Sequence, residues 1–261
     1  MPNPIFIEIG GITIRWYGIT AALGFAAGFL YIKKFLPSLV GKSALQNIQG
    51  HVEKLLFPLV IVGLVGARLY HVLNEPRFYL EHPTLIPAIW HGGLAIHGGV
   101  IASALYLWRY TRKQRISFLR FADILMPALL LGQAIGRWGN FFNQELFGAP
   151  TKLPWGIFID PVNRPSGFES FSHFHPAFLY ESLWNVLIVV GITFWRSRQK
   201  QQKPGVVLGV ALVFSGIVRL LVELLRIDTV PVVLGIRLPL LVSAVIVILG
   251  IGMLLYIYDT T

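Results

Sequence analysis

Polar side chains follow directly after an apolar run in the middle of the chain. The stretch GQAIGRWGNFFNQELFG, residues 132–148, places Arg137, Asn140, Asn143 and Glu145 among glycines and aromatic rings. Guanidinium and amide groups hydrogen-bond the oxygens of a polar ligand. The glycines around Arg137 allow a ligand to approach the backbone closely. These residue types favour a ligand site, while Asn143 and Glu145 also fit turn and loop positions.

A second charged group lies on one helical face. Ser215, Arg219, Glu223 and Arg226 fall within about 80° of one another at 100° per residue. An uncompensated charge at the centre of a membrane helix costs about 2.5–3.5 kcal/mol, so such residues usually face a polar interior. An arginine pair there suits a phosphate because guanidinium forks match its oxygens. The lipid headgroup is the phosphate available near the membrane surface.

The composition places these groups in an integral membrane protein. Of the 261 residues, 55% are hydrophobic and 13% are charged, and the mean hydropathy is +0.66, far outside the soluble globular range. The formal net charge of +10 reflects basic loops near anionic lipid, and no nucleic-acid motif accompanies it. Cysteine is absent, so any thiol in the chemistry must come from a substrate.

The apolar runs predict an all-α membrane protein of seven transmembrane helices in a single domain, residues 1–261. A span needs about 20 apolar residues. The expected spans are Ile12–Ile32, Leu55–Leu73, Gly92–Trp108, Phe121–Ile135, Pro176–Trp195, Val206–Leu225 and Leu238–Tyr258. The first is expected to be retained, because no signal-peptide pattern precedes it. The loop 139–175, rich in Pro, Gly, Asn and rings, predicts a small ordered periplasmic head.

Basic residues set the expected orientation. Thirteen of the 22 Lys and Arg residues fall in one alternate set of loops and seven in the opposite set, so the N-terminus is expected outside and the C-terminus inside. On this topology polar residues from several spans share the outer leaflet, and Asp123 stands apart near the inner side. The group comprises Arg68, His71, His97, Arg137, His175, Glu181, Arg219, Glu223 and Arg226. One polar cavity, open toward the outer leaflet, is expected.

Ordered motifs along the chain resemble those of the prolipoprotein diacylglyceryl transferase family. The signature-like stretch is GRWGNFFNQE at residues 136–145. The further matches are RWYG at 15–18, GARLYHVL at 66–73, GGLAIHGG at 92–99, HPAFLYE at 175–181 and GIVRLLVELLR at 216–226. The chain departs from the family pattern at Ser215, Ala21 and Phe178, where the family usually has Tyr, Tyr and Gln.

The resemblance implies an enzyme of the bacterial inner membrane with its active site facing the periplasmic leaflet. It implies transfer of the diacylglyceryl group from phosphatidylglycerol to the lipobox cysteine of a prolipoprotein signal peptide, forming a thioether and releasing glycerol 1-phosphate. The expected partners are these two substrates and the bilayer, without nucleic acid. No cofactor and no metal are expected.

The resemblance also suggests roles for individual residues. The functional histidine of the family matches His97, which we assign as the base, since a histidine of pKa about 6.5 suits a thiol of pKa about 8.5. Its arginine pair matches Arg137 and Arg219, assigned as a phosphate clamp. The expected headgroup ligands are Asn140 and Asn143. The other matched positions, expected to hold the arginines or contact substrate, are Glu145, His175, Glu181, Glu223 and Arg226.

Structural roles compete with these assignments. Arg137 also fits a residue that snorkels to the interface, and Arg219 with Glu223 fits an ion pair between helices. His175 and Glu181 suit a brace at a helix start. Two other functions also stay open: a non-catalytic or altered-specificity paralogue that binds phospholipid, and a small-solute transporter, although no internal repeat supports a transporter.

Overall fold

The computed structural model describes residues 3–10, 12–40, 42–199 and 203–259. Helices dominate it. They are α1 (Trp16–Val40), α2 (Lys42–Asn74), α3 (Pro76–Glu81), α4 (Ile96–Gln114), α5 (Phe118–Asn143), α6 (Ala177–Arg198), α7 (Val206–Glu223) and α8 (Leu238–Asp259). The chain forms two compact units: a small unit of residues 42–121, and a large unit that contains the residues before and after it.

Within the described ranges, six helices are long and apolar enough to cross a membrane. Their apolar segments are Trp16–Pro37, Ile48–Asn74, Phe118–Asn143, Ala177–Arg198, Val206–Glu223 and Leu238–Asp259. The expected third span, Gly92–Trp108, corresponds to α4, which is a helix but is not among the six. Its last two turns carry Arg109, Arg112 and Lys113. The structure therefore supports a membrane protein of six candidate spans, and the count of seven stays a prediction.

The first span begins later than expected, at Trp16 and not at Ile12. Residues before it form an antiparallel hairpin of β1 (Ile5–Ile9) and β2 (Ile12–Arg15). The physical reason is the run of β-branched residues on both sides of Gly10, which favours extended backbone. Gly10 itself has a positive φ of 57°, a turn conformation that glycine adopts without a steric penalty.

The fourth span is longer than expected at both ends. Helix α5 continues through Gly139 to Asn143, so the loop predicted to start at residue 139 begins at Gln144. Gly139 lies inside the helix, at a close contact between α5 and α1. A Cβ atom there would lie 2.6 Å from the ring of Tyr17 on α1, so glycine is needed for the two helices to approach.

Residues 144–176 form an ordered head in the large unit. Two short strands, β3 (Ile157–Phe158) and β4 (His173–Phe174), pair antiparallel, and Phe147, Ile159 and Phe174 form a buried core. Two aromatic side chains and Ile159 thus form a small hydrophobic core, and the periplasmic location of this segment stays a prediction. A 3-10 turn, η3 (Pro161–Asn163), also lies within the head.

Backbone and side-chain bonds tie the head to the helices around it. The Gln144 amide donates to Asp160 Oδ2, and Asp160 N donates back to Gln144 Oε1 at 2.7 Å. Ala149 N donates to Leu225 O at 2.7 Å, just beyond α7. These bonds fix the head against the ends of α5 and α7.

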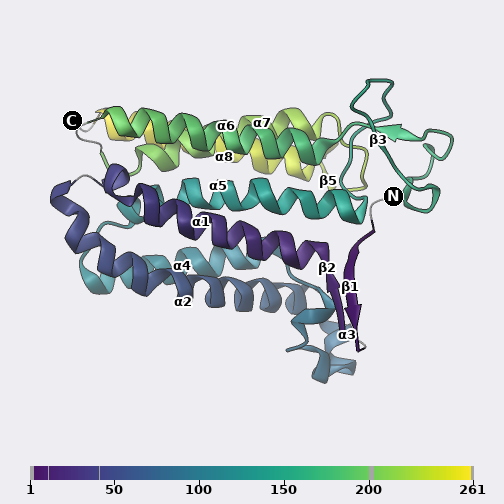
Figure 1. Ribbon diagram of the computed structural model, residues 1–261, viewed down its shortest axis with the longest axis horizontal. Coiled ribbons are helices and arrows are strands. Elements are labelled where there is room, and N and C mark those ends of the chain that lie inside the picture. Colours follow the sequence, from purple (N-terminus) through teal and green to yellow (C-terminus); the bar gives the residue numbers. More distant parts are fainter. Residues whose placement is uncertain (1–2, 11, 41, 200–202, 260–261) are drawn as a thin grey trace. The chain divides into compact units, whose positions relative to one another are not determined.

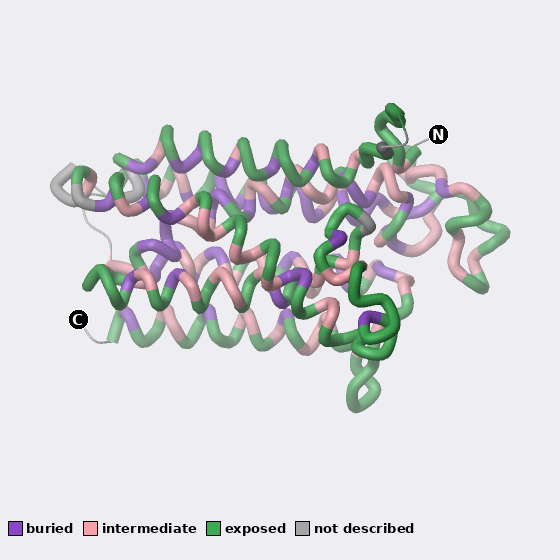
Figure 2. The backbone as a smooth tube through the Cα atoms, turned by 90° about the horizontal axis from the view of Figure 1, so that it is seen from below, coloured by how far each residue is buried: buried purple, intermediate pink, exposed green. Residues whose placement is uncertain are grey.

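Helices α6, α7 and α8 of the large unit run side by side (Figure 1). The helices carry exposed residues beside buried ones (Figure 2), and the buried residues of α8 are Ser243, Gly250 and Ile257. The exposed side chains include Leu183, Leu187, Val190, Ile248 and Leu249. Large apolar side chains on the outer faces of long helices suit contact with lipid chains.

Asp123 has a structural role within α5. Its carboxylate accepts hydrogen bonds at 2.7 Å from Gly205 N and from Leu208 N. These amides belong to the start of α7, where the first turn has no intrahelical acceptors. The acidic residue that stands apart from the outer polar group therefore caps a neighbouring helix.

In the small unit, α2 and α4 touch through their backbones. A Cβ atom added at Gly98 of α4 would lie 2.3 Å from the carbonyl oxygen of Gly66 on α2. Such an approach is possible only with glycine at the contact, as in many pairs of membrane helices. A hairpin of β5 (Val232–Val233) and β6 (Ile236–Arg237) precedes α8 in the large unit. Two 3-10 turns, η1 (Pro83–Leu85) and η2 (Ile89–His91), lie between α3 and α4.

Candidate active site

Glu181 contacts two arginines in the large unit. Its Oε2 lies 2.5 Å from Arg137 Nη2, and Arg219 Nη1 lies 3.2 Å from Oε1 and 3.3 Å from Oε2. The three residues come from α6, α5 and α7 respectively. The structure therefore brings together both arginines predicted to bind phosphate, and it places a carboxylate from the HPAFLYE motif between them.

Local packing sets this geometry. Glu181 lies in the second turn of α6, which starts directly after Pro176, and Pro is well suited to a helix start because it needs no hydrogen-bond acceptor for its nitrogen. The next residue, Ser182, donates its Oγ hydrogen to Ala134 O at 2.8 Å. Ala134 is one turn before Arg137 on α5, so this buried bond sets how α5 and α6 face each other at the site.

The exposure of the three side chains suits a binding site for an anion. The Glu181 side chain is 8% exposed, whereas those of Arg137 and Arg219 are 25% and 33% exposed. Two guanidinium groups and one carboxylate leave one net positive charge. Among the described residues, contacts engage only Nη1 of Arg219, so several donors of its five N–H groups are left for a ligand.

A short relay of amides extends from Arg137. Its Nη1 lies 3.5 Å from Asn140 Oδ1, and the side-chain nitrogens of Asn140 and Asn143 donate to Glu145 Oε1 at 2.8 and 3.2 Å. Asn143 Oδ1 is buried and has no hydrogen-bond partner within the described part of the chain. Such an orphaned acceptor is costly unless a donor reaches it, so it is suited to a ligand hydroxyl.

Glu223 and Arg226, which were expected to line the substrate site with Arg219, form an ion cluster with Arg237 and Asp228. Glu223 Oε1 lies 2.8 Å from Arg237 Nη2, and Arg226 pairs with Asp228 at 2.8 Å. Arg219 forms its ion pair with Glu181 in place of the ion pair with Glu223 that the sequence also suggested. Side chains along one helical face have different partners because the neighbouring elements change along the helix axis.

The cluster shifts the acidity of its members. Burial acts to raise the pKa of Asp228, but the hydrogen bond and the charge of Arg226 outweigh it and hold that pKa below its ordinary value. Burial acts to lower the pKa of Arg226, and Asp228 outweighs it in turn, so the pKa of Arg226 lies above its ordinary value. Sequence reasoning assigned no role to Asp228 or Arg237. The hairpin pattern VVLGIR was the available signal, because its turn brings Arg237 back toward α7.

His175 takes part in a structural chain at the start of α6. Its Nδ1 lies 3.0 Å from the hydroxyl of Tyr180, which accepts a hydrogen bond at 2.9 Å from Trp155 Nε1. Its backbone nitrogen donates to Ala149 O. His175 therefore joins the head to α6, in line with the bracing role, while Glu181 contacts the arginines directly.

Phe178, one of the departures from the family pattern, is buried among aromatic rings. Its ring centroid lies 5.4 Å from that of Trp138 and 5.2 Å from that of Phe141. Both partners belong to the GRWGNFFNQE stretch. An apolar ring at position 178 is explained by this packing.

His97 lies in the small unit, in the first turn of α4, and its side chain is exposed. Its ring centroid is 6.2 Å from that of Tyr70. Arg137 and Arg219 belong to the large unit. The common cavity of these three residues that was expected from the sequence therefore stays a prediction.

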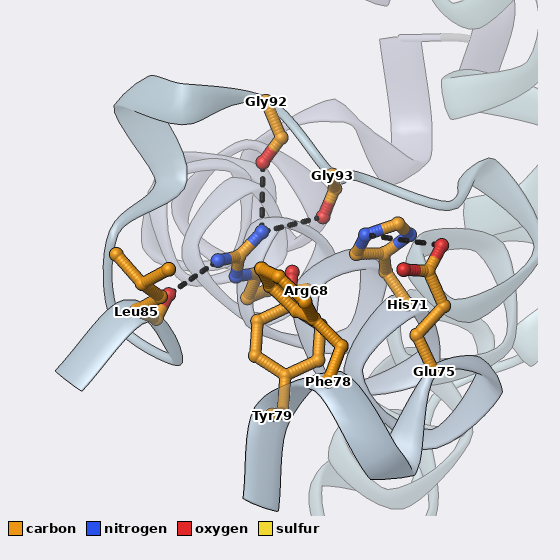
Figure 3. A pocket seen from close by; sticks show the side chains of 8 residues that line it. All are labelled: Arg68, His71, Glu75, Phe78, Tyr79, Leu85, Gly92 and Gly93. Atoms are coloured by element: carbon orange, nitrogen blue, oxygen red, sulfur yellow. Dashed lines mark hydrogen bonds and ion pairs between the residues drawn. The ribbon is translucent and has the colours of Figure 1, made fainter. Parts of the chain in front are cut away.

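The small unit also contains a pocket of about 310 Å³ lined by Arg68, His71, Glu75, Phe78 and Tyr79 (Figure 3). Arg68, expected at the outer end of its span, is 6% exposed. Figure 3 shows its guanidinium directed at the loop above it and not into bulk solvent.

Comparison with known proteins gives consistent matches over almost the whole length. A family model described as "Prolipoprotein diacylglyceryl transferase" matches residues 4–256. A phosphatidylglycerol–prolipoprotein diacylglyceryl transferase of Gloeobacter violaceus is 40% identical over 251 residues, which cover 95% of this chain and 90% of that protein. Proteins of the same name from Parasynechococcus marenigrum and Synechocystis sp. are 40% and 38% identical, covering 95% and 98% of this chain and 91% and 90% of their own.

Proposed function

The chain belongs to the prolipoprotein diacylglyceryl transferase family, and we infer that it transfers the diacylglyceryl group of phosphatidylglycerol to a prolipoprotein cysteine. The observation that carries the chemical part of this inference is the meeting of Arg137 and Arg219 at Glu181. A paired guanidinium site is suited to the phosphate that must leave in this reaction.

The reaction is a substitution at carbon. The sulfur of the substrate cysteine attacks the carbon of the diacylglycerol moiety that is bonded to the phosphate oxygen. The C–S bond forms as this C–O bond breaks. Glycerol 1-phosphate leaves with the electron pair of the broken bond, and the thiol proton passes to a base. Since the chain has no cysteine, the attacking sulfur comes from the lipobox of the prolipoprotein signal peptide.

Arg137 and Arg219 stabilise the leaving phosphate. Its charge increases as the C–O bond breaks, so fixed cations stabilise the transition state more than the ground state. Glu181 keeps both guanidinium groups oriented before the substrate binds, which lowers the cost of arranging them during the reaction. Its burial keeps the carboxylate on the inner side of the pair, while the more exposed arginines face the phosphate.

Asn143 binds a hydroxyl of the glycerol headgroup. Its buried Oδ1 is an acceptor without a partner in the described part of the chain, and glycerol carries hydroxyl donors next to the phosphate. Glu145 holds the amide nitrogens of Asn140 and Asn143, so the acceptor oxygen of Asn143 has a fixed direction. This arrangement favours phosphatidylglycerol over phospholipids whose headgroups lack hydroxyls.

His97 accepts the thiol proton. Its position at the start of α4 leaves the imidazole exposed, and a neutral imidazole can accept a thiol proton. The assignment rests on the match of the GGLAIHGG stretch to the family pattern.

The membrane arrangement is seven spans, with α4 as the third. At 1.5 Å per residue its 19 residues extend about 28 Å, close to the thickness of a bilayer core. The helix exposes Ile101, Leu105 and Trp108 and packs against a candidate span through Gly66 and Gly98. Together with the bias of basic residues, these features support a location in the inner membrane, with the head and the arginines on the periplasmic side.

Purified chain incubated with phosphatidylglycerol and a lipobox peptide tests the function. Thioether product and glycerol 1-phosphate are expected from the wild type. The variants His97→Gln and Arg137→Ala should fold and release little glycerol phosphate, and Arg77→Ala, at an exposed residue of α3, should behave as the wild type. Lipid binding without product identifies a non-catalytic paralogue. The absence of both lipid binding and product refutes the proposal. Near-normal release by either site variant refutes the assigned role of that residue.

A further inference from the structure

Arg68 holds four carbonyl groups of the loop that precedes α4 (Figure 3). Its Nε donates to Ile86 O at 2.8 Å, and its Nη2 donates to Leu85 O. Its Nη1 donates to Gly92 O at 2.8 Å and to Gly93 O at 3.0 Å. One buried side chain thus joins two stretches of the loop that lie about seven residues apart.

The loop fits closely around this side chain. Gly93 has a positive φ of 71°, and a Cβ atom there would lie 2.5 Å from Arg68 Nη1 and 2.6 Å from the His71 ring. On another side, the Arg68 guanidinium lies 5.2 Å from the centroid of the Tyr79 ring, a cation–π distance. The guanidinium is therefore held in one place, and the loop is shaped to it.

The same turn of α2 also holds the residues that follow the loop. Ala95 N donates to Ala67 O at 3.0 Å, directly beside Arg68. Gly98 touches the backbone of Gly66. His97 lies between these two anchor points, so its backbone is positioned by contacts with residues 66–68 of α2.

A lysine could not make the same contacts. A guanidinium presents five N–H donors in a flat fork, whereas an ammonium is a compact point with three donors. The four carbonyls are spread around three different nitrogens of Arg68. The buried charge is compensated by these carbonyl dipoles, because the described residues place no carboxylate within ion-pair distance of Arg68.

We propose that Arg68 is a positioning residue for His97: it shapes residues 85–95 so that the first turn of α4 presents the imidazole in one orientation. The proposal rests on the proposed function, in which His97 is the base. Arg68 does not contact the reacting atoms. It acts by fixing the backbone path into α4.

The variant Arg68→Lys tests this in the complete purified chain with phosphatidylglycerol and a lipobox peptide. A misplacement of about 1 Å costs on the order of 10²-fold in rate, so kcat should fall by roughly that factor while KM for the lipid changes little, because the arginines of the large unit are untouched. The matched control Arg77→Lys, at an exposed arginine of the same unit, should leave both constants unchanged.

A second readout follows His97 itself. In histidine-labelled protein, the imidazole signal that disappears in His97→Gln belongs to residue 97. We expect Arg68→Lys to shift, split or broaden that signal, whereas Arg77→Lys leaves it in place. This measurement does not depend on activity, so it separates failure of the positioning role from failure of His97 as the base.

An unchanged kcat in folded Arg68→Lys, or an unchanged His97 signal, overturns the proposal. If that variant does not fold, Gly93→Ala supplies the same test, because its added methyl would lie 2.5 Å from Arg68 Nη1 and would displace the guanidinium. If both variants fail to fold, Arg68 is a stability residue and the positioning role is refuted.

Discussion

Replacement of Glu181 by glutamine removes the carboxylate that contacts both arginines proposed to bind phosphate. The shape of the side chain is kept, but one of its two oxygens becomes an amide nitrogen that faces a guanidinium. Contacts at 2.5 Å to Arg137 and 3.2 Å to Arg219 are lost or weakened. The two arginines then repel each other without a compensating charge.

The size of the effect follows from these contacts. A hydrogen bond to a charged group contributes about 1.5–3 kcal/mol, and the partial exposure of both arginines screens part of it. We therefore expect a destabilisation of about 2–4 kcal/mol. The net charge of the three-residue group rises by one, which strengthens the attraction to a phosphate near 4 Å by about 1 kcal/mol in a water-like medium.

The kinetic consequence is a split between the two constants. With the arginines no longer oriented in advance, kcat should fall by on the order of 10²-fold. KM for phosphatidylglycerol should stay constant or fall by up to about fivefold, since 1 kcal/mol corresponds to that ratio. Release of glycerol 1-phosphate at several lipid concentrations measures both constants.

The control is Glu81→Gln, an exposed glutamate of α3 whose replacement changes the net charge equally. It should leave kcat and KM as in the wild type. A Glu181→Gln enzyme with wild-type kcat, or one in which only KM rises, refutes the view that Glu181 orients the pair.

Three further outcomes are expected. Because the pKa of Asp228 is held low, its pair with Arg226 stabilises the fold above the unfolded pKa of about 3.9, and this stabilisation is lost as the pH falls through the lower folded pKa. The difference in melting temperature between wild type and Asp228→Asn should therefore be constant above about pH 4 and should disappear below it. A difference that does not depend on pH contradicts this. Asp123→Asn should lower stability by about 1–3 kcal/mol, because one of two short bonds to the start of α7 is replaced by an amide facing an N–H group, with specific activity per folded molecule preserved; equal thermal stability argues against the capping role. The chain has no cysteine, so single cysteines placed before and after α4 can test whether that helix crosses the membrane. In intact cells whose outer membrane is permeabilised, an impermeant maleimide should label Thr84→Cys and not Gln114→Cys. Equal labelling of both means that α4 does not cross the membrane.

Much of the architecture was predictable from local patterns in the sequence. Long apolar runs must form hydrogen-bonded helices in lipid, so six of the expected spans coincide with helices of sufficient length. The motif around Arg137 and the stripe that carries Arg219 were visible as polar residues in apolar surroundings. Their joint use for phosphate was an expectation that rested on the family resemblance as well as on residue chemistry. Their meeting at Glu181 is compatible with that expectation, and the phosphate role stays a prediction.

The tertiary structure decided which partner each charge has and where the elements end. Arg219 pairs with Glu181, 38 residues away, and not with Glu223 on its own helix, because a neighbouring helix supplies a closer carboxylate. Helix α5 continues through Gly139 because Tyr17 packs there, a contact no local pattern reveals. Helical periodicity is a short-range property of the chain, whereas charge pairing and close packing depend on residues that only folding brings together.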